Sequence, residues 1–223
     1  MRRIAVLASG RGSNLQAVLD AIAAGQLDAE IVGVFSDKPG APALQRVPAA
    51  LRWSADARDY ADRDAFDAVL AAAVAERQPD WVLCAGYMRI LGEAFIAGLR
   101  GRLLNIHPSL LPRFRGLRTH ARALAAGERE HGASVHFVTP ELDAGAVIAQ
   151  AVVPVLAGDD AESLAARVLA VEHPLLIATL RLAVSGRLAE RGATVMADGH
   201  PLFTPLRLDS AGDLQADDGA ASA

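Results

Sequence analysis

The chain has 223 residues, which suits one large domain with a core of ordinary size. Its 52% hydrophobic and 22% charged residues are typical of a globular protein and exclude a largely disordered chain. The net charge of -4 argues against a nucleic-acid-binding surface, so any anion site must be local. Cys84 is the only cysteine, and the N-terminus has only a short apolar run broken by glycine. We therefore expect a cytoplasmic protein that binds neither nucleic acid nor membrane.

Short apolar segments alternate with helical patterns in the first half of the chain. Residues 4–8 predict a buried strand, and the polar turn 9–14 separates it from a helix. Further strands are predicted at 31–35, 81–85 and 103–106, with a helix at 65–77. Strands joined through helices form parallel sheets. The expected fold class is therefore α/β, a mostly parallel twisted sheet with helices on both faces, whose ligands bind at the carboxyl ends of the strands.

The second half of the chain predicts a short helix at 120–126, strands at 134–138 and 147–155, and a long helix at 160–184. The polar link between the two strands is long enough to be a functional loop. Residues 208–223 contain few apolar side chains, so we expect a disordered tail there. The rest of the chain, 1–207, is expected to form one domain.

The turn Ser9-Gly10-Arg11-Gly12-Ser13-Asn14 lies between a predicted strand and a predicted helix. Glycines allow close backbone approach, and free N–H groups at a helix start favour a phosphate. The alternative is a tight turn with Asn14 as the helix N-cap. A dinucleotide site is also conceivable, because Asp37 follows the second strand where a ribose-binding acid could lie. Leu15 occupies the third fingerprint glycine position, however, and this favours a single phosphate.

Asn105 and His107 are two residues apart at the end of a predicted strand, so their side chains point to the same side. An amide donor beside an imidazole suits acyl transfer, which needs an oxyanion stabiliser and a proton carrier. A structural histidine is the alternative for His107. Ser134 and His136 share a face in the same way, and the loop after them carries Asp143, which could orient and stabilise a protonated imidazole. By itself, the Asp143 segment could be a simple turn.

Three further features of the sequence say less about function. The six histidines do not fall into a metal-ligand spacing, so we expect no catalytic metal. Arg113, Arg115 and Arg118 form either a solvated basic loop or an anion clamp. Cys84, inside an apolar strand, is interpreted as a buried small side chain.

Several motifs in order make the chain resemble the phosphoribosylglycinamide formyltransferase family, the folate-dependent enzymes of purine synthesis. The resemblance covers about residues 3–207 and is carried by LASGRGSNLQA, VFSDK, AGYMRIL, GRLLNIHPSLLP, HGASVHFVTPELDAG and ARVLAVEHPLL. It implies a Rossmann-like formyltransferase fold and a catalytic domain over 1–207. It also implies transfer of a formyl group from 10-formyltetrahydrofolate, as co-substrate, to the amine of 5'-phosphoribosylglycinamide.

The resemblance further implies site residues. In such enzymes the residue matching Asn105 holds the formyl oxygen, that matching His107 donates or shuttles the proton, and that matching Asp143 favours the protonated histidine. The phosphoribosylglycinamide would be held by Gly12, Ser13, Asn14, Leu169, Ala170, Val171 and Glu172. The folate would contact Arg63, Met88, Arg89, Ile90, Leu91, Asn105, Thr139, Pro140, Glu141, Leu142 and Asp143, with apolar walls from Cys84, Phe95, Ile96 and Leu103.

The sequence departs from the family pattern in three places. Asp37 stands where asparagine is frequent, the stretch 41–53 is short and interrupted by Pro42 and Pro48, and Arg118 replaces a frequent histidine in a loop that lacks its usual proline. None of these changes involves Asn105, His107 or Asp143.

Three alternatives compete with this interpretation. A 10-formyltetrahydrofolate hydrolase shares the same three residue types, but typically begins with a regulatory domain, and the Gly-Arg-Gly-Ser-Asn turn favours a nucleotide amine as acceptor. A formyltransferase acting on aminoacyl-tRNA normally has an extra C-terminal domain and a basic surface. A non-catalytic nucleotide-binding module would not need Asn105, His107 and Asp143 together. Oligomeric state stays open between monomer and homodimer.

Overall fold

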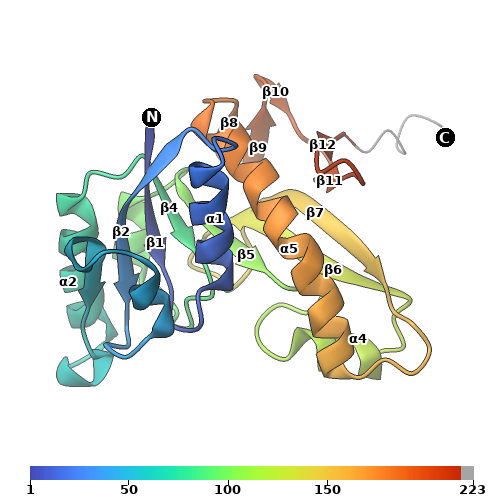
Figure 1. Cartoon of the computed structure of the whole chain (residues 1–223), viewed down its shortest axis with the longest axis horizontal. Coiled ribbons are helices and arrows are strands. Elements are labelled where there is room, and N and C mark those ends of the chain that lie inside the picture. Colours follow the sequence, from blue (N-terminus) through green and yellow to red (C-terminus); the bar gives the residue numbers. More distant parts are fainter. Residues whose placement is uncertain (217–223) are drawn as a thin grey trace. The chain divides into compact units, whose positions relative to one another are not determined.

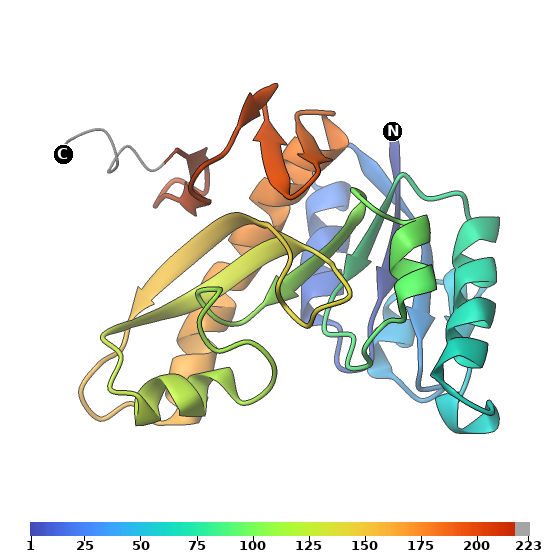
Figure 2. The ribbon, with the colours of Figure 1, turned by 180° about the vertical axis from the view of Figure 1, so that it is seen from behind.

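The computed structural model describes residues 1–216, and its contacts divide the chain into two compact units (Figures 1 and 2). The first comprises Met1–Asn105 and Val138–Pro140, and the second comprises Ile106–Phe137 and Glu141–Ala223. Each unit is described in turn.

The first unit is built on parallel strands in the order β5-β4-β1-β2-β3. Their bounds are β1 (Arg2–Leu7), β2 (Ala29–Ser36), β3 (Arg52–Ser54), β4 (Trp81–Cys84) and β5 (Leu103–His107). The strands predicted at 4–8, 31–35, 81–85 and 103–106 are confirmed. Buried β-branched and aliphatic residues on both faces of β1 and β4 explain why these strands read as continuous apolar runs.

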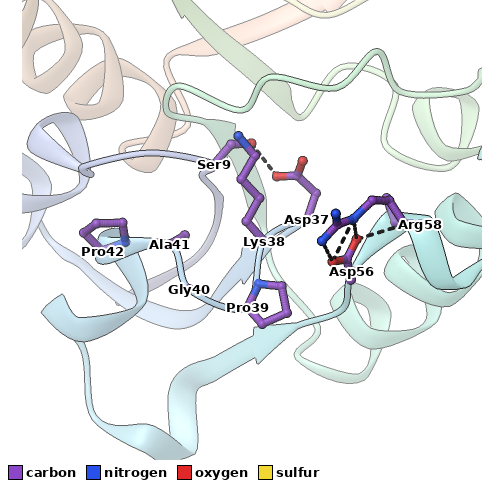
Figure 3. Close-up of a pocket in the computed structure, with 10 residues that line it drawn as sticks. Ser9, Asp37, Lys38, Pro39, Gly40, Ala41, Pro42, Asp56 and Arg58 are labelled. Carbon is purple, nitrogen blue, oxygen red and sulfur yellow. Dashed lines mark hydrogen bonds and ion pairs between the residues drawn. The ribbon is translucent and has the colours of Figure 1, made fainter.

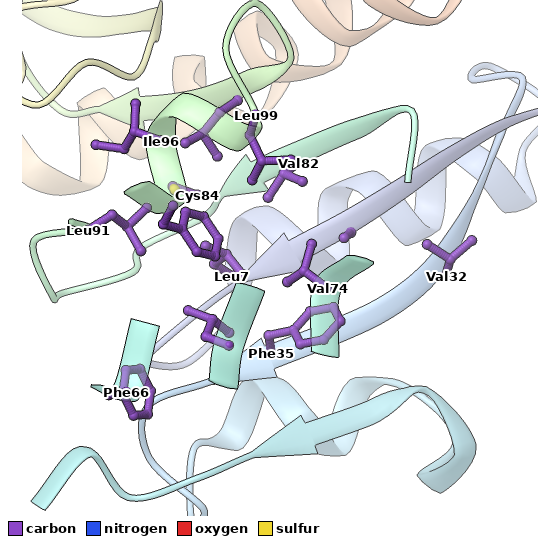
Figure 4. Close-up of a cluster of buried hydrophobic side chains, with 14 residues drawn as sticks. Leu7, Val32, Phe35, Phe66, Val74, Val82, Cys84, Leu91, Ile96 and Leu99 are labelled. Carbon is purple, nitrogen blue, oxygen red and sulfur yellow. The ribbon is translucent and has the colours of Figure 1, made fainter. Parts of the chain in front are cut away.

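Helices cover both faces of this sheet. Helix α1 (Ser13–Ala23) lies in front of it in Figure 1, and α3 (Glu93–Gly98) lies in front of it in the reverse view of Figure 2. Helix α2 (Arg63–Glu76) begins after Asp62, whose side chain accepts the Ala65 N–H. The faces of α2 and α3 that meet the sheet form one apolar cluster (Figure 4), in which Phe66 and Leu70 pack with Phe35, Leu7 and Cys84.

The stretch between β2 and α2 contains three short 3₁₀ turns in place of a helix. They span Pro42–Arg46, Ala49–Leu51 and Ala57–Asp59. Pro42 stands at the start of the first turn, and Pro48 directly precedes the second. Proline lacks the N–H that a helix interior needs, which confirms the interruption predicted here.

The second unit contains α4 (Thr119–Ala125), β6 (Glu130–Phe137), β7 (Val147–Pro154) and α5 (Ala161–Val184), as predicted within a few residues. Strands β6 and β7 are antiparallel and come very close at Gly132, where a Cβ would lie 1.9 Å from the Ala151 oxygen. Helix α5 packs along both strands. It is long and apolar enough to cross a membrane, yet half of its most apolar stretch is buried in the fold, as expected for a core helix.

The C-terminal part holds more structure than predicted. Strands β8 (Leu188–Arg191), β9 (Thr194–Ala197) and β10 (His200–Pro201) form a small antiparallel sheet. Strand β11 (Leu206–Leu208) pairs with β7, and β12 (Leu214–Gln215) pairs with β11. The expected disorder from 208 is therefore wrong as far as residue 216, because Asp209 accepts the N–H groups of Ala211 and Asp213 and closes a turn. Residues 217–223 of the expected tail lie outside the described part.

Candidate active site

The second unit places His107, the last residue of β5, against Asp143. Nδ1 of His107 lies 3.4 Å from Oδ2 of Asp143, and their side chains are only 8% and 9% exposed. Nε2 of His107 lies 3.1 Å from the Phe114 carbonyl oxygen. A carbonyl can only accept, so Nε2 carries a proton. A protonated ring would direct both of its N–H groups at acceptors, and this suits a proton carrier.

Asp143 is held in place by its own backbone and by a neighbouring loop. It adopts a left-handed conformation, with φ of 48°, which aspartate tolerates better than most residues. Its Oδ2 accepts the Gly116 N–H at 2.9 Å. The predicted functional loop 139–145 therefore delivers Asp143 to His107.

His136 completes the group around Asp143. Nδ1 of His136 donates to the Phe137 carbonyl at 2.7 Å, so Nε2, 3.7 Å from Oδ1 of Asp143, is the lone-pair side of the neutral ring. Burial, only partly opposed by the Phe137 hydrogen bond and the Asp143 charge, lowers the pKa of His136 to about 4. The sequence placed His136 correctly beside Asp143, and its burial favours the neutral form of the ring.

A second histidine pair lies behind the Phe114 loop. Nε2 of His131 is 3.2 Å from Nδ1 of His120, and the Phe114 ring meets the His131 ring edge-on at 6.1 Å. Burial and the nearby His120 and His107 lower the pKa of His131 to about 4, and burial also lowers the pKa of His120. His131 therefore packs against the residue whose carbonyl faces His107, and His120 packs against His131.

The loop that follows His107 is fixed by a buried hydroxyl. Ser134 donates to the Ser109 carbonyl at 2.7 Å and accepts the Leu111 N–H at 3.1 Å. Gln150 donates to the Leu111 carbonyl and to Ser134, both at 2.9 Å. The predicted Ser134 thus supports the site through the backbone, without contacting His107 in any described hydrogen bond.

In the first unit, the glycine turn forms the start of α1. Gly12 is the helix N-cap, with φ of 73°, so the prediction that Asn14 caps the helix is wrong. Ala43 donates its N–H to the Gly10 carbonyl, and Arg46 donates Nε–H to the Arg11 carbonyl. A helix start leaves its first N–H groups without helical partners. These N–H groups are donors, so they are the groups of the turn that suit a phosphate.

The segment predicted to bind folate follows β4. Met88 and Ile90 are 57% and 53% exposed, whereas Leu91 is buried. The Arg89 guanidinium lies 5.0 Å from the centre of the Phe66 ring. The segment ends at Gly92, whose N–H donates to the buried Oδ2 of Asp67 at 2.6 Å. Burial raises the pKa of the Asp67 carboxyl, which the Gly92 hydrogen bond only partly opposes.

The other predicted site residues are spread over both units. Arg63 begins α2, and its Nε lies 3.4 Å from Asp64. Glu141 pairs with Arg115 at 2.6 Å. In α5, Glu172 is 8% exposed despite its charge, and it follows Leu169, Ala170 and Val171. Thr139 and Pro140 belong to the first unit, while Leu142, 49% exposed, belongs to the second. Asn105 precedes the unit boundary within β5.

A pocket of about 510 Å³ lies at the carboxyl ends of β1, β2 and β3, close to the glycine turn (Figure 3). It is lined by Ser9, Asp37, Lys38, Pro39, Gly40, Ala41, Pro42, Asp56, Ala57 and Arg58. Figure 3 shows the Ser9 hydroxyl and the Asp37 carboxylate directed toward each other, and Asp56 paired with Arg58. Asp37, considered as a ribose-binding acid, is thus bound to Ser9 through one oxygen.

The sequence reasoning missed several residues of these networks. Asp67 and Gln150 were not singled out, although a charged or amide side chain inside an apolar pattern is a usable signal. The partnership of Phe114 with His107 could not be predicted, because it depends on a backbone carbonyl. Within residues 1–216, no group of three or more His, Cys, Asp or Glu side chains could hold a metal ion.

Comparison with known proteins gives the site its context. Residues 2–180 match the family model described as formyl transferase. Phosphoribosylglycinamide formyltransferase of Escherichia coli is 45% identical over 201 residues, covering 89% of this chain and 95% of that protein. The structure of phosphoribosylglycinamide formyltransferase from Coxiella burnetii superposes with a TM-score of 0.86 at 43% identity, covering 90% of this chain and 95% of that one.

A formyltetrahydrofolate deformylase from Pseudomonas syringae is also similar, with a TM-score of 0.79 and 28% identity. That likeness covers 88% of this chain but 65% of the deformylase. The family match runs through the glycine turn, β5 with His107 and the loop that carries Asp143. The chain belongs to the formyl transferase family.

Proposed function

We propose that this protein transfers the formyl group of 10-formyltetrahydrofolate to the amine of 5'-phosphoribosylglycinamide, a step of purine biosynthesis. The observation that carries the proposal is the buried His107–Asp143 pair, at 3.4 Å, within a chain 45% identical to the Escherichia coli formyltransferase. We also propose that residues 1–207 act as one catalytic domain, because the family match over residues 2–180 includes parts of both compact units. The proposed location is the cytoplasm.

Asn105, His107 and Asp143 are proposed to be the catalytic residues. The amine attacks the formyl carbon, a new C–N bond forms, and the bond from the formyl carbon to the folate nitrogen breaks. The Asn105 amide and protonated His107 stabilise the oxyanion. A proton passes from the attacking nitrogen to the departing folate nitrogen through a water held by His107 and Asp143.

His107 must change a hydrogen bond to do this. Its Nε2–H faces the Phe114 carbonyl at 3.1 Å and its Nδ1 faces Asp143. A ring N–H reaches the formyl oxygen only if the substrate replaces one of these acceptors. Asp143 is the better partner to retain because its charge stabilises the imidazolium, so we assign the exchange to Phe114.

The substrates are assigned to the segments that suit their chemistry. The phosphate of the nucleotide would bind the N–H groups of Gly12, Ser13 and Asn14, and residues 169–172 are also proposed to contact the nucleotide. The folate would bind along 88–91 and 139–143, with Arg63 near its carboxylates, because the exposed Met88 and Ile90 offer apolar contact.

Formate release and formyl transfer, measured in parallel, test the proposal. With 10-formyltetrahydrofolate alone, formate release should be negligible, and adding 5'-phosphoribosylglycinamide should start formyl transfer, since the site favours a positioned amine over water. The likeness to a deformylase makes hydrolysis the second candidate. Formate release at full rate without the amine would replace the transferase by the hydrolase.

A further inference from the structure

Ser9 connects the glycine turn to the segment 86–92. It lies two residues after the end of β1, and its N–H donates to the Gly86 carbonyl at 3.1 Å. Its hydroxyl oxygen accepts the Met88 N–H at 2.9 Å and donates its proton to Oδ1 of Asp37 at 2.5 Å. Ser9 is 5% exposed, so these bonds are shielded from water. One side chain therefore holds the backbone of a segment almost eighty residues away in the sequence.

Asp37 determines which way the Ser9 hydroxyl points. A serine hydroxyl has one proton and can rotate to suit several partners. The Asp37 carboxylate, 7% exposed, accepts that proton in a short charge-assisted bond. With the proton committed to Asp37, a lone pair of Ser9 remains for the Met88 N–H. Asp37 therefore acts on Met88 through Ser9.

Packing holds the segment 88–91 unevenly. Leu91 is buried in the apolar cluster, whereas Met88 and Ile90 are each more than half exposed, so packing fixes these two residues weakly. The polar contacts lie at the two ends: Ser9 binds Met88 N–H, and Asp67 binds Gly92 N–H. We propose that Ser9 and Asp37 are positioning residues that hold 88–91 in the conformation that binds folate. This inference rests on the proposed function.

Asp37 could instead bind the ribose of a nucleotide, because it lines the pocket of Figure 3 at the end of β2. We favour the positioning role because Oδ1 already accepts the Ser9 proton and Ser9 in turn holds Met88. The two roles predict opposite ligand effects: positioning affects folate, whereas a ribose contact affects the nucleotide.

The test compares Ser9→Ala, Asp37→Ala and Asp37→Asn with the control Ser36→Ala in the full-length protein. Ser36 is a matched control, since it is fully buried on β2 and its hydroxyl accepts a loop N–H, that of Lys38. Direct titrations measure the Kd of 10-formyltetrahydrofolate and of 5'-phosphoribosylglycinamide. Ser9→Ala and Asp37→Ala should weaken folate binding about threefold to tenfold, the range for one lost hydrogen bond.

The remaining Kd values should stay close to those of the unmutated protein. Asp37→Asn keeps an acceptor for the Ser9 proton, so its folate Kd should change by less than about threefold. Ser36→Ala should leave both affinities unchanged. Nucleotide affinity should stay within about twofold in every variant, and steady-state kinetics should show a higher KM for folate at nearly unchanged kcat.

Amide hydrogen exchange at Met88 provides a readout that needs no substrate. Exchange should accelerate in Ser9→Ala and Asp37→Ala and stay unchanged in Ser36→Ala, because only the first two release the Met88 N–H. Unchanged exchange, or faster exchange with unchanged folate affinity, would overturn the positioning role. Selective loss of nucleotide affinity in Asp37→Ala would favour the ribose role. If the unmutated protein bound no 10-formyltetrahydrofolate, the proposed function would be wrong, and the inference about folate binding would be wrong with it. The exchange data would still show whether Ser9 holds the Met88 N–H.

Discussion

Nδ1 of His107 lies 3.4 Å from Oδ2 of Asp143, in a setting where both side chains are more than nine-tenths buried. Because both side chains are shielded from water, salt screens this contact much less than it would screen one at the surface. The pair also fixes the ring orientation, because Gly116 N–H holds the same carboxylate oxygen. The proposed proton transfer depends on this contact.

Asp143→Asn should lower kcat by about 100-fold, at the lower end of what one proton-transfer partner contributes. Asparagine tolerates the left-handed backbone of this position, so the fold should survive. Asp198→Asn is a matched control, since Asp198 also has a positive φ and pairs with Arg187 in the β8–β9 hairpin. The rate of formyl transfer is measured across a range of pH. If Asp143→Asn kept both the rate and the pH dependence of the unmutated protein, the proposed role of the His107–Asp143 pair would be wrong.

Asn105→Ala should slow transfer by about 100- to 1000-fold, the usual effect of removing one oxyanion donor. Substrate Kd values should change little, because the amide acts on charge that develops in the transition state. The effect is measured as the single-turnover rate of formyl transfer, with both substrates at saturating concentration, in Asn105→Ala and in the unmutated protein. A raised Kd at an unchanged single-turnover rate would mean that Asn105 binds the ground state instead.

Gly12→Ala should both destabilise the protein and weaken nucleotide binding. A Cβ there would lie 2.8 Å from Cβ of Ala43 and 2.9 Å from its Cα, at a φ of 73° that disfavours alanine. We expect a loss of about 1–3 kcal/mol in the free energy of unfolding. Denaturant unfolding and nucleotide titration measure the two effects.

Gly10→Ala is the control for the same turn. A Cβ at Gly10 meets no atom within 4 Å, and its φ is not positive, so stability should be retained. Folate affinity should be nearly unchanged in both variants, because only the nucleotide has a phosphate for this turn. Equal loss of both ligands in Gly12→Ala would argue against that division of the site.

Acid should destabilise the protein through His131. Burial lowers the pKa of His131 to about 4, below the ordinary value of 6.5. Between these two values the unfolded chain binds a proton that the native state does not, so stability falls as the pH drops from 6.5 to 4. The contribution of one such group is up to about 3 kcal/mol.

Urea unfolding of His131→Gln between pH 4 and 7 measures this contribution. The variant should show a flatter dependence of unfolding free energy on pH than the unmutated protein, whatever its absolute stability. His200→Gln, at an exposed position, is the control. An identical slope in His131→Gln would assign the acid sensitivity to other groups, of which His136 is the first to examine.

The local patterns of the sequence were sufficient to predict most of the strands and helices of the first unit. Apolar runs such as Ile4–Leu7 and Trp81–Cys84 are buried on both faces, so their pattern reports their environment directly. The two-residue spacing of Asn105 and His107 likewise follows from strand geometry alone. The motif order around these residues indicated the family, which the family match confirms.

Other features depend on contacts between distant segments. Residues 209–216 look like a polar tail, yet β12 forms because β11 pairs with β7 and offers it an edge. Helix α3 is only six residues long, too short for a clear period, and is stabilised by its place in the apolar cluster. Asp37 resembles a ribose-binding acid in sequence, and only the fold brings the Ser9 hydroxyl to it.

The sequence by itself therefore determined the type of sheet and the family, and it offered Asn105, His107 and Asp143 as the proposed catalytic residues, because these depend on short-range periodicity and on motifs. Only the tertiary structure decided what each group faces. The contact of His107 with the Phe114 carbonyl and the hydrogen bond of Ser9 with the Met88 N–H both involve a backbone atom, and the second joins residues that are far apart in the chain. A backbone carbonyl or N–H is the same in every residue, so no sequence pattern marks the one that a side chain will bind.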